Sequence, residues 1–577
     1  MERQVYEFIA AQTGENIVER KKCPNCGQEF AITDKDLEFY SKVSPVFNGT
    51  KYEIPAPTLC PDCRLQRRLT RRNERILYKR KCDLTWKMMV SVYSPDNPCK
   101  VYLTKERQSD NRDPMIYGRD FDFSRPFFEQ FNELNLDVPK FSLFTDTTTN
   151  INSDYANEWW HIKDSYFVFN VDFLEWCLYC SDCHRSQNLT DCERCSDSQN
   201  CYESQDLTNC SSLKNSINCN NCSYSEFLTD CEWCKNCFYC FNLTNQEYNI
   251  WNVKYTKEEY EKIIKDRSLL KETIETNLWK IDKNMKNYRG YWNEDVFGDG
   301  INKSKYIKLC FNITDGENIA YSDKIWWSKD VYDIYAFGNN IQLNMEWCSI
   351  WENSYKSSFN YGVAINVSEI FYSICCLYSS NLFGCVWLRN KQYCIFNKQY
   401  TKEEYEELVP KIIEHMKKYW ERWEYFPIKN STYGYNETMA HQYFPLTRDQ
   451  AIAKWYKWQD NEYPINIPEG IELLQTKDLP DNISDVEDNI LNKAIICEVS
   501  GKPFRIVKPE LEFYRKHNLP LPRKHPEVRH LERFNETYFR NLYLRKCDNC
   551  GKEVISVYPQ NSDFKVYCEE CYNKNSY

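Results

Sequence analysis

The stretch that decides the fold covers residues 177–243 and reads CLYCSDCHRSQNLTDCERCSDSQNCYESQDLTNCSSLKNSINCNNCSYSEFLTDCEWCKNCFYCFNL. Its 13 cysteines, from Cys177 to Cys240, all stand at positions divisible by three. The other residues in this phase are only Ser and Leu, and the phase continues upstream through Ile162, Val168 and Leu174. One face of the segment is therefore small or aliphatic, while the positions between are mostly polar residues and tyrosine.

A period of three fits neither an α-helix nor a flat strand. It fits narrow coils of very short strands, each of which turns one small residue inward. Cys183, Cys201, Cys222 and Cys240 recur at intervals of 18, 21 and 18 residues, which predicts structural repeats of about 20 residues. The spacing resembles that of the tight β-solenoids of beetle antifreeze proteins, without their Thr-x-Thr arrays. We therefore expect a narrow β-solenoid with a core of Cys, Ser and Leu.

A second block repeats the first with most of its thiols replaced. Residues 243–260 recur as residues 388–405, an offset of 145, whereas residues 160–166 recur as residues 326–332, an offset of 166. The difference of 21 residues predicts that the second block has lost about one coil. Because aliphatic residues replace thiols in its phase, we expect the cysteines to be core filler. The alternative is an iron–sulfur or extra zinc site in residues 231–240.

Each block is expected to end in a helix that covers its open end. Thr256 and Thr401 are suitable N-cap residues, and Glu259 and Glu404 complete two capping boxes. The predicted helices cover residues 257–287 and 402–424. Such covers are needed because an exposed solenoid end invites edge-to-edge association.

Two groups of four cysteines have the spacing of zinc sites. The first group consists of Cys23, Cys26, Cys60 and Cys63, and the second of Cys547, Cys550, Cys568 and Cys571. Each group contains two Cys-x-x-Cys pairs, and each tight turn aims two thiolates at one ion. We expect two structural Zn²⁺ ions per chain and no catalytic zinc, since four protein ligands leave no open coordination position.

The two terminal modules are copies of each other that have lost complementary sites. Residues 37–42, 82–83, 91–93 and 100–102 match residues 511–516, 547–548, 556–558 and 565–567. In place of the second group, the N-terminal copy has Cys82, Thr85, Leu103 and Glu106. In place of the first group, the C-terminal copy has Cys497, Ser500, His525 and Val528. Leucine and valine cannot ligate a metal, so each copy is expected to hold one ion.

The most basic stretch directly follows the second Cys-x-x-Cys pair. Its nine basic residues are Arg64, Arg67, Arg68, Arg71, Arg72, Arg75, Lys79, Arg80 and Lys81. At helical spacing Arg64, Arg68, Arg71 and Arg75 share one face. Arginine suits bidentate contact with phosphate, so we expect an arginine-rich helix that binds nucleic acid. The alternative is that these arginines pair with the chain's own carboxylates.

Composition limits the other functions. The 577 residues carry a net charge of −10, so any contact with nucleic acid must come from a local patch. The sequence has no secretory signal and no run of about 18 apolar residues, which predicts a cytoplasmic protein with reduced thiols and no membrane partner. It also has no G-x-S-x-G, HExxH, Walker A or dinucleotide-binding motif, which favours a non-enzymatic role.

The whole chain resembles an uncharacterised family of cysteine-rich zinc-ribbon proteins from reduced-genome candidate-phylum bacteria. The matching segments are residues 60–63 with their arginine tail and residues 118–131, 444–449, 478–482 and 497–504. Members are sometimes labelled CaiB/BaiF CoA transferases, a label that the residues do not support. Thr85 departs from the Cys-x-x-Cys pair of the family, which argues against a second N-terminal zinc.

The sequence predicts a mostly β, multidomain chain with two narrow β-solenoid blocks, each capped by an α-helix, between duplicated zinc-ribbon modules. The expected parts are the N-terminal module 1–110, linker 111–150, blocks 151–290 and 291–425, linker 426–489 and the C-terminal module 490–577. The expected function is a non-enzymatic zinc-binding scaffold that binds RNA or an RNA–protein assembly through the arginine-rich helix, with the solenoids as spacer or docking surface. The alternatives are a purely protein-binding scaffold and a glycan-acting enzyme or iron–sulfur redox protein.

Overall fold

The computed structural model describes residues 3–108, 113–153, 155–191, 211–214, 216, 219, 221–277, 284–461, 470–537 and 540–576. Part of the triplet pattern, including Cys192, Cys195, Cys201 and Cys210, lies outside the described residues.

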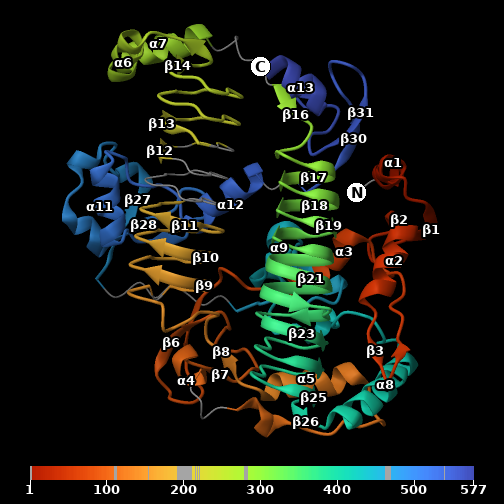
Figure 1. Cartoon of the computed structure of the whole chain (residues 1–577). Helices are drawn as coiled ribbons and strands as arrows, with labels where there is room; N and C mark the ends of the chain where they lie inside the picture. Colours follow the sequence, from red (N-terminus) through yellow and green to blue (C-terminus); the bar gives the residue numbers. More distant parts are fainter. Residues whose placement is uncertain are drawn as a thin grey trace. The chain divides into compact units, whose positions relative to one another are not determined.

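The chain forms two compact units, and each combines segments that are far apart in the sequence. Unit 1 comprises Met1–Ser142, Met285–Asp460 and Arg540–Asn575. Unit 2 comprises Leu143–Asn284, Asn461–Phe539 and Ser576–Tyr577. Each unit contains one β-solenoid (Figure 1); we call the one in unit 2 block 1 and the one in unit 1 block 2. Among the helices of the described ranges, none is long and apolar enough to cross a membrane.

Both blocks are stacks of parallel coils, which confirms the predicted β-solenoid. The strands of block 1 are β9 (Ala156–Lys163), β10 (Val168–Glu175), β11 (His184–Gln187), β12 (Ser211–Lys214), β13 (Ser223–Glu226), β14 (Asn249–Ile250) and β15 (Val253–Lys254). Those of block 2 are β17 (Glu294–Asn302), β18 (Lys305–Thr314), β19 (Glu317–Ala320), β20 (Asp323–Trp326), β21 (Lys329–Tyr355), β22 (Ser358–Tyr361), β23 (Ile365–Phe371), β24 (Ser380–Phe383), β25 (Gln392–Ile395) and β26 (Lys398–Gln399). In both blocks the last pair of strands is antiparallel and closes the stack.

One coil takes 12 residues, not about 20. Val168 pairs with Ala156, Lys305 with Glu317 and Ser368 with Ser380. Single coils of block 2 differ by one residue, since Glu294 pairs with Lys305 and Met345 with Ser358. The predicted repeat length was wrong because all four inward positions of a coil accept cysteine, so the motif need recur only at multiples of three. The 21 residues missing from the second block therefore amount to nearly two coils.

Every third residue makes the corner between two sides of a coil. In block 1 the φ angle is positive at each third position from Glu158 to Asp191 and again from Asn221 to Trp251. For an L-residue the left-handed helical conformation costs about 1–2 kcal/mol, and Asn and Asp adopt it most readily after glycine. This preference explains why so many of the corner positions between the cysteines are Asn or Asp.

The inward positions of the triplets form the cores of both blocks. In block 1 Cys177, Cys183, Cys222 and Cys237 are at most 1% exposed. In block 2 the same role falls mainly to isoleucine, valine and leucine, with a few cysteines. Burial of small side chains on all four sides leaves a narrow core that is filled without a gap for a ligand.

Inward Cys and Ser also satisfy the backbone at the corners. Cys310 Sγ donates to the carbonyl of Lys308 at 3.3 Å and accepts from the N–H of Ser322 at 3.4 Å. One coil on, Ser322 Oγ donates to the carbonyl of Ala320 at 2.9 Å and accepts from the N–H of Ile334 at 3.1 Å. Thiol and hydroxyl thus do the same work, which explains why the two residue types share one phase.

This ladder makes a testable prediction at Cys310. Cys310→Ser keeps both hydrogen bonds and is expected to change the free energy of unfolding by less than about 1 kcal/mol. Cys310→Val keeps an apolar side chain but leaves the Lys308 carbonyl and the Ser322 N–H without this partner, which costs about 1–3 kcal/mol. Denaturant unfolding of the two variants checks the difference, and equal stability of both would contradict the role of the thiol.

Helices follow each block, as predicted, but they are shorter than expected. After block 1 come α6 (Lys257–Lys265) and α7 (Arg267–Asn277), and after block 2 comes α8 (Lys402–Lys418). The capping boxes at Thr256 and Thr401 are both formed. Asp266 separates α6 from α7, and α8 stops at Tyr419, before Trp420 with its positive φ, so the predicted single helices 257–287 and 402–424 were wrong in extent. Tyr260 and Ile263 of α6 pack on Phe238 and Ile250, which covers that end of block 1.

Four small ribbons make up the two terminal modules. Ribbon N1 (residues 17–69) contains β1 (Ile17–Lys22), β2 (Glu29–Thr33), α2 (Asp34–Val43), β3 (Val46–Phe47), β4 (Thr50–Lys51) and α3 (Pro61–Leu69). Ribbon N2 (78–107) contains β5 (Tyr78–Lys81), β6 (Met88–Ser91), β7 (Val101–Tyr102) and α4 (Thr104–Arg107). Ribbon C1 (493–537) contains β28 (Lys493–Ile496), β29 (Pro503–Phe504), α11 (Lys508–Lys516) and α12 (Pro526–Thr537). Ribbon C2 (543–576) contains β30 (Tyr543–Lys546), β31 (Glu553–Ser556), β32 (Lys565–Tyr567) and α13 (Glu569–Ser576).

The remaining elements connect the ribbons and the blocks. They are α1 (Arg3–Thr13), η1 (Pro114–Tyr117), α5 (Phe127–Asp137), β8 (Lys140–Phe141), β16 (Asn284–Lys286), η2 (Ile428–Asn430), η3 (Tyr435–Glu437), α9 (Met439–Tyr443), α10 (Arg448–Ala453), β27 (Glu472–Gln475), η4 (Thr476–Asp478), η5 (Ile483–Asp485) and η6 (Asp488–Asn492).

Candidate metal centres and the docking of the ribbons

The first four-cysteine group lies at the start of α3. Cys23 and Cys26 are in the turn between β1 and β2, Cys60 immediately precedes α3 and Cys63 lies in its first turn. The four Sγ atoms lie within 4.8 Å of one another, and those of Cys26 and Cys60 are 3.6 Å apart. The group that the sequence predicts is therefore assembled in ribbon N1.

The second group is assembled in ribbon C2. Its four Sγ atoms also lie within 4.8 Å of one another, and those of Cys550 and Cys568 are 3.8 Å apart. Burial acts to raise the pKa of Cys547, but the N–H groups of Cys550, Cys568 and Asn549 outweigh it and lower that pKa to about 6. A thiol that loses its proton near neutral pH is ready to ligate a metal.

The two other ribbons keep the turn but not the ligands. In N2 the N–H of Leu103 donates to Cys82 Sγ at 3.3 Å, as the N–H of Cys568 donates to Cys547 Sγ at 3.3 Å in C2. In C1 the N–H of Ser500 donates to Cys497 Sγ at 3.4 Å. Within the described parts of the chain, only N1 and C2 bring together a group of His, Cys, Asp or Glu that could hold a metal. Each module thus keeps one potential site, as predicted from Leu103 and Val528.

The basic segment after Cys63 is not an exposed helix. Helix α3 ends at Leu69, and after a turn the segment continues into β5. Arg64, Arg68 and Arg72 are 1%, 0% and 2% exposed. Arg71, Arg75 and Arg80 are also buried, Arg67 is half-buried, and only Lys79 and Lys81 are exposed. The expectation of an exposed arginine face was therefore wrong, because the molecule's own carboxylates and carbonyls occupy it.

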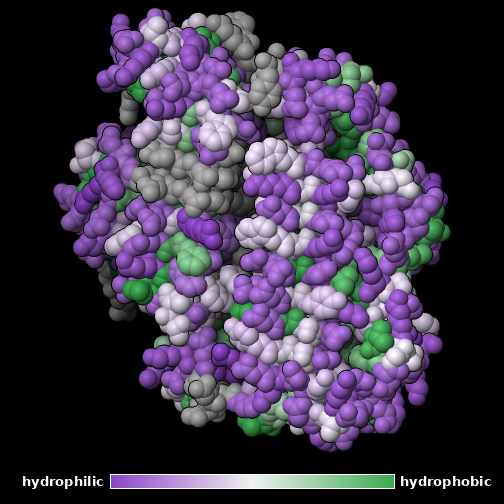
Figure 2. Space-filling view, in the orientation of Figure 1, coloured by the Kyte–Doolittle hydropathy of each residue, from purple (hydrophilic) through white to green (hydrophobic). Residues whose placement is uncertain are grey.

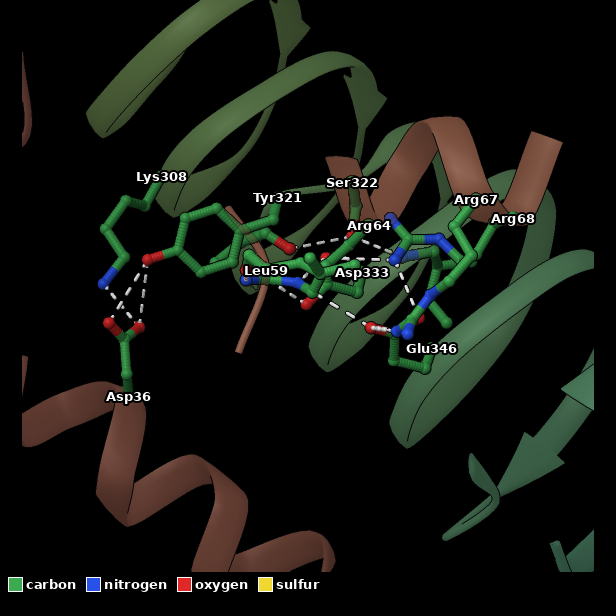
Figure 3. A network of polar contacts seen from close by, with 12 residues as sticks. Asp36, Leu59, Arg64, Arg67, Arg68, Lys308, Tyr321, Ser322, Asp333 and Glu346 are labelled. Carbon is green, nitrogen blue, oxygen red and sulfur yellow. Dashed lines mark hydrogen bonds and ion pairs between the residues drawn. The ribbon is translucent and has the colours of Figure 1, made fainter. Parts of the chain in front are cut away.

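The buried arginines dock α3 on block 2 (Figure 3). Arg64 Nη2 and Nε lie 2.8 Å and 2.9 Å from the two carboxylate oxygens of Asp333. Arg68 Nη1 lies 3.2 Å from Asp333 and 3.0 Å from Glu346. The guanidinium of Arg64 also lies over the ring of Tyr321, 5.1 Å from its centre. We call these five residues the N-terminal lock.

The lock balances its charges. Arg67 joins it through Glu346 at 3.2 Å and Glu424 at 3.0 Å. Burial acts to raise the pKa of Glu346, but the charges of Arg68, Arg67 and Arg64 outweigh it, so this pKa lies below its ordinary value. Three guanidinium groups thus face three carboxylates, and paired charges are the condition under which burial is tolerated.

The other arginines of the segment also have internal partners. Arg71 donates to the carbonyls of Asn430, at 2.7 Å, and Pro427. Arg72 contacts Glu74 and Ser349. In N2, Arg80 donates to Asp83 at 3.0 Å, and Arg545 repeats this contact in C2 with Asp548 at 2.7 Å.

A second lock of the same design lies in unit 2. Arg529 of α12 contacts the carboxylate of Asp191, and its guanidinium lies 5.0 Å from the ring centre of Tyr179. Arg533 Nη2 lies 3.5 Å from Asp191, and the hydroxyl of Tyr179 donates to Glu510 at 2.8 Å. We call these five residues the C-terminal lock.

The two locks correspond residue by residue. Arg529 and Arg533 follow Arg64 and Arg68 by 465 residues, the offset that also relates Cys547 to Cys82. On the solenoids, Tyr179 and Asp191 stand one 12-residue coil apart, as Tyr321 and Asp333 do. Ribbon C1 has no complete four-cysteine group, yet its helix docks in the same way. The arginine contacts therefore form without a complete ligand set beside them.

Sequence analysis missed the acidic partners Asp333, Glu346 and Asp191. Acidic residues are too common in this chain to stand out, and a 20-residue repeat hides their place on the coil. The signal that could have found them is the offset of 142 residues that relates both Tyr179 to Tyr321 and Asp191 to Asp333.

The cysteines of the solenoid core do not form a metal site among the described residues. Cys231, Cys234, Cys237 and Cys240 occupy the four sides of one coil, and each Sγ donates to the backbone carbonyl two residues earlier. The only four-cysteine groups within the described ranges are those of N1 and C2. The described core cysteines thus act as buried hydrogen-bonding filler, as expected for packing.

Comparison with known proteins adds little. No family model matches the chain, and no curated protein matches it. A solved structure from Desulfovibrio desulfuricans G20, provisionally described as an acetyltransferase, is similar over 41% of this chain and 65% of its own length. The identity is 8% and the TM-score 0.09, so this likeness carries no argument about fold or function.

Proposed function

We propose that this chain is a non-enzymatic scaffold in which structural Zn²⁺ stabilises ribbons N1 and C2 and arginine locks fix the ribbon modules on β-solenoids. The observation that carries the proposal is the repetition of the lock. Arg64 with Asp333 and Arg529 with Asp191 bury the same contacts in two separate units. A motif that is duplicated, buried and charge-paired serves assembly better than it serves an external ligand.

The donor chemistry favours zinc. Four thiolates in a compact group are the ligand set of structural zinc sites. Zinc–sulfur bonds of about 2.3 Å in a tetrahedron place the sulfur atoms about 3.8 Å apart. The distances of 3.6 Å for Cys26 and Cys60 and of 3.8 Å for Cys550 and Cys568 match that spacing.

RNA binding through residues 64–81 is not part of this proposal. A phosphate would have to displace Asp333 and Glu346 from arginines that have almost no contact with solvent. Lys79 and Lys81 alone offer too little charge for a salt-sensitive phosphate contact of useful strength. The exposed faces of the solenoid coils are the surfaces left for a partner.

Metal content tests the zinc part of the proposal. Purified protein is expected to contain two zinc ions per chain, as measured by mass spectrometry of the elements. Cys26→Ser and Cys550→Ser should each lower the content to one ion. Cys82→Ser is the matched control and should leave two, because Cys82 stands alone in its turn. A content of four ions, or of none in protein prepared with zinc, would contradict the assignment.

Recovery of the protein from cells tests the scaffold against RNA binding. The chain is purified at low and moderate salt, and nuclease-sensitive RNA is sequenced. We expect no enriched RNA. Enrichment that falls with salt and disappears in an Arg67→Ala, Arg71→Ala double variant would return function to the arginine segment.

A further inference from the structure

The face of block 2 that begins each coil is exposed and carries a regular row of aromatic side chains. Three columns define this face, one middle and two corner columns. The middle column is Lys305, Glu317, Lys329, Gln342, Tyr355, Ser368, Ser380 and Gln392. The corner columns are Lys303, Asp315, Trp327, Asn340, Asn353, Asn366, Tyr378 and Asn390, and Tyr306, Asn318, Asp330, Leu343, Lys356, Glu369, Asn381 and Tyr393. We call this surface the aromatic face.

The exposed aromatics recur at every second coil. Tyr306 belongs to the first coil of the face, Trp327 to the third, Tyr355 to the fifth and Tyr378 to the seventh. Their exposed fractions are 47%, 58%, 47% and 44%. Neighbouring coils lie about 4.8 Å apart, so these rings follow one another at intervals of about 10 Å. In Figure 2 pale residues interrupt the purple surface along block 2.

Three of these rings are held at a backbone cost. The φ angles of Tyr306, Trp327 and Tyr378 are 56°, 45° and 50°. A bulky residue in the left-handed region is strained, and Asn, which fills many other corners, would be cheaper there. Exposure means that burial does not repay this strain, so the rings are better explained by what they bind than by what they stabilise.

The coils between the rings carry amides. The face holds eight Asn and Gln side chains, and those of Asn340, Asn353 and Asn366 form a hydrogen-bonded ladder with Nδ2 to Oδ1 distances of 2.7 Å and 2.8 Å. Its four lysines, Lys303, Lys305, Lys329 and Lys356, are balanced by four carboxylates, Asp315, Glu317, Asp330 and Glu369. A neutral surface of amides and rings does not suit a polyanion such as RNA, whose binding requires net positive charge.

We propose that the aromatic face binds an extended, neutral β-1,4-linked polysaccharide along the solenoid axis. Two sugar rings of such a chain span close to the distance between alternate coils, so one aromatic ring can stack on every second sugar. The amides between them donate to and accept from the hydroxyl groups of the sugar in between. This inference rests on the proposed scaffold and names the partner class of one of its exposed surfaces.

Binding to defined polymers tests the inference. Full-length protein is mixed with insoluble cellulose and with chitin, and with soluble cellohexaose in a titration. Retention on at least one polymer is expected, with tighter binding of the hexasaccharide than of the disaccharide by at least tenfold. A Trp327→Ala, Tyr355→Ala double variant should lose at least tenfold in affinity. Trp455→Ala, which removes a ring that is 82% exposed but off this face, is the control and should bind normally.

Each outcome decides the matter. No retention of the unchanged protein on either polymer, or equal binding by the double variant, would overturn the inference. Equal loss in Trp455→Ala would also overturn it, because binding would then not depend on this face. Zinc content is measured on the same samples, so a sugar result that fails while two zinc ions remain leaves the proposed scaffold standing.

Discussion

Asp333→Ala is expected to lower the free energy of unfolding of unit 1 by about 3–5 kcal/mol. The substitution leaves Arg64 and Arg68 buried without the carboxylate that they share, and Glu346 alone must then face three guanidinium groups. An uncompensated charge of this kind is costly because neither water nor a second carboxylate can reach it. Denaturant unfolding followed by circular dichroism measures the loss, and hydrogen exchange locates it at α3.

Two further variants make this result specific. Glu317→Ala removes an exposed ion pair with Lys329 on the same solenoid and should cost less than about 1 kcal/mol. Asp191→Ala removes the equivalent carboxylate of the C-terminal lock and should loosen α12. If Asp333→Ala costs no more than Glu317→Ala, the lock does not hold the module.

Removal of the metal is expected to unfold ribbon C2 while α3 stays docked. The buried core of C2 consists of Cys547, Val554, Cys568 and Cys571, so the metal group is almost the whole core. Structural zinc contributes about 10–16 kcal/mol to the folding of comparable small sites, which such a ribbon cannot replace. Hydrogen exchange of protein treated with a zinc chelator should therefore show complete loss of protection over residues 543–576.

Helix α3 should respond differently because the lock holds it independently of the metal. Ribbon C1 docks α12 through Arg529 without a complete four-cysteine group, and it serves as the internal reference. We expect α3 to keep most of its protection in chelator, as α12 does. Equal loss in α3 and C2 would mean that the metal, and not the arginines, holds the N-terminal module.

The triplet pattern predicts the core because it is a local rule. Inward positions such as Cys177 and Ile370 can be assigned from phase alone, since each side of a coil has three residues. The coil length does not follow from the phase, because four equivalent sides give no residue that marks one full turn. The 12-residue coil becomes visible only when Val168 is seen to pair with Ala156.

The metal groups could be predicted, whereas the role of the arginines could not. Thiols such as Cys23 and Cys26 are close in sequence, so their spacing already contains the geometry of the site. The partners of Arg64 lie more than 250 residues away on coils whose length was unknown, and a basic helix looks the same whether it faces solvent or a buried carboxylate. Charge pairing over such a distance is a tertiary property that a local pattern does not contain.

Chemical modification of arginine tests the central claim most directly. Native protein is treated with phenylglyoxal, and the modified residues are identified by peptide mass spectrometry. Arg64, Arg68 and Arg72, which are at most 2% exposed, should remain unmodified while the exposed Arg3 and Arg20 react, and all five should react after unfolding. Modification of Arg64, Arg68 and Arg72 in the native protein at the rate of Arg3 would contradict the account, because the segment would then be an open basic surface and not a lock.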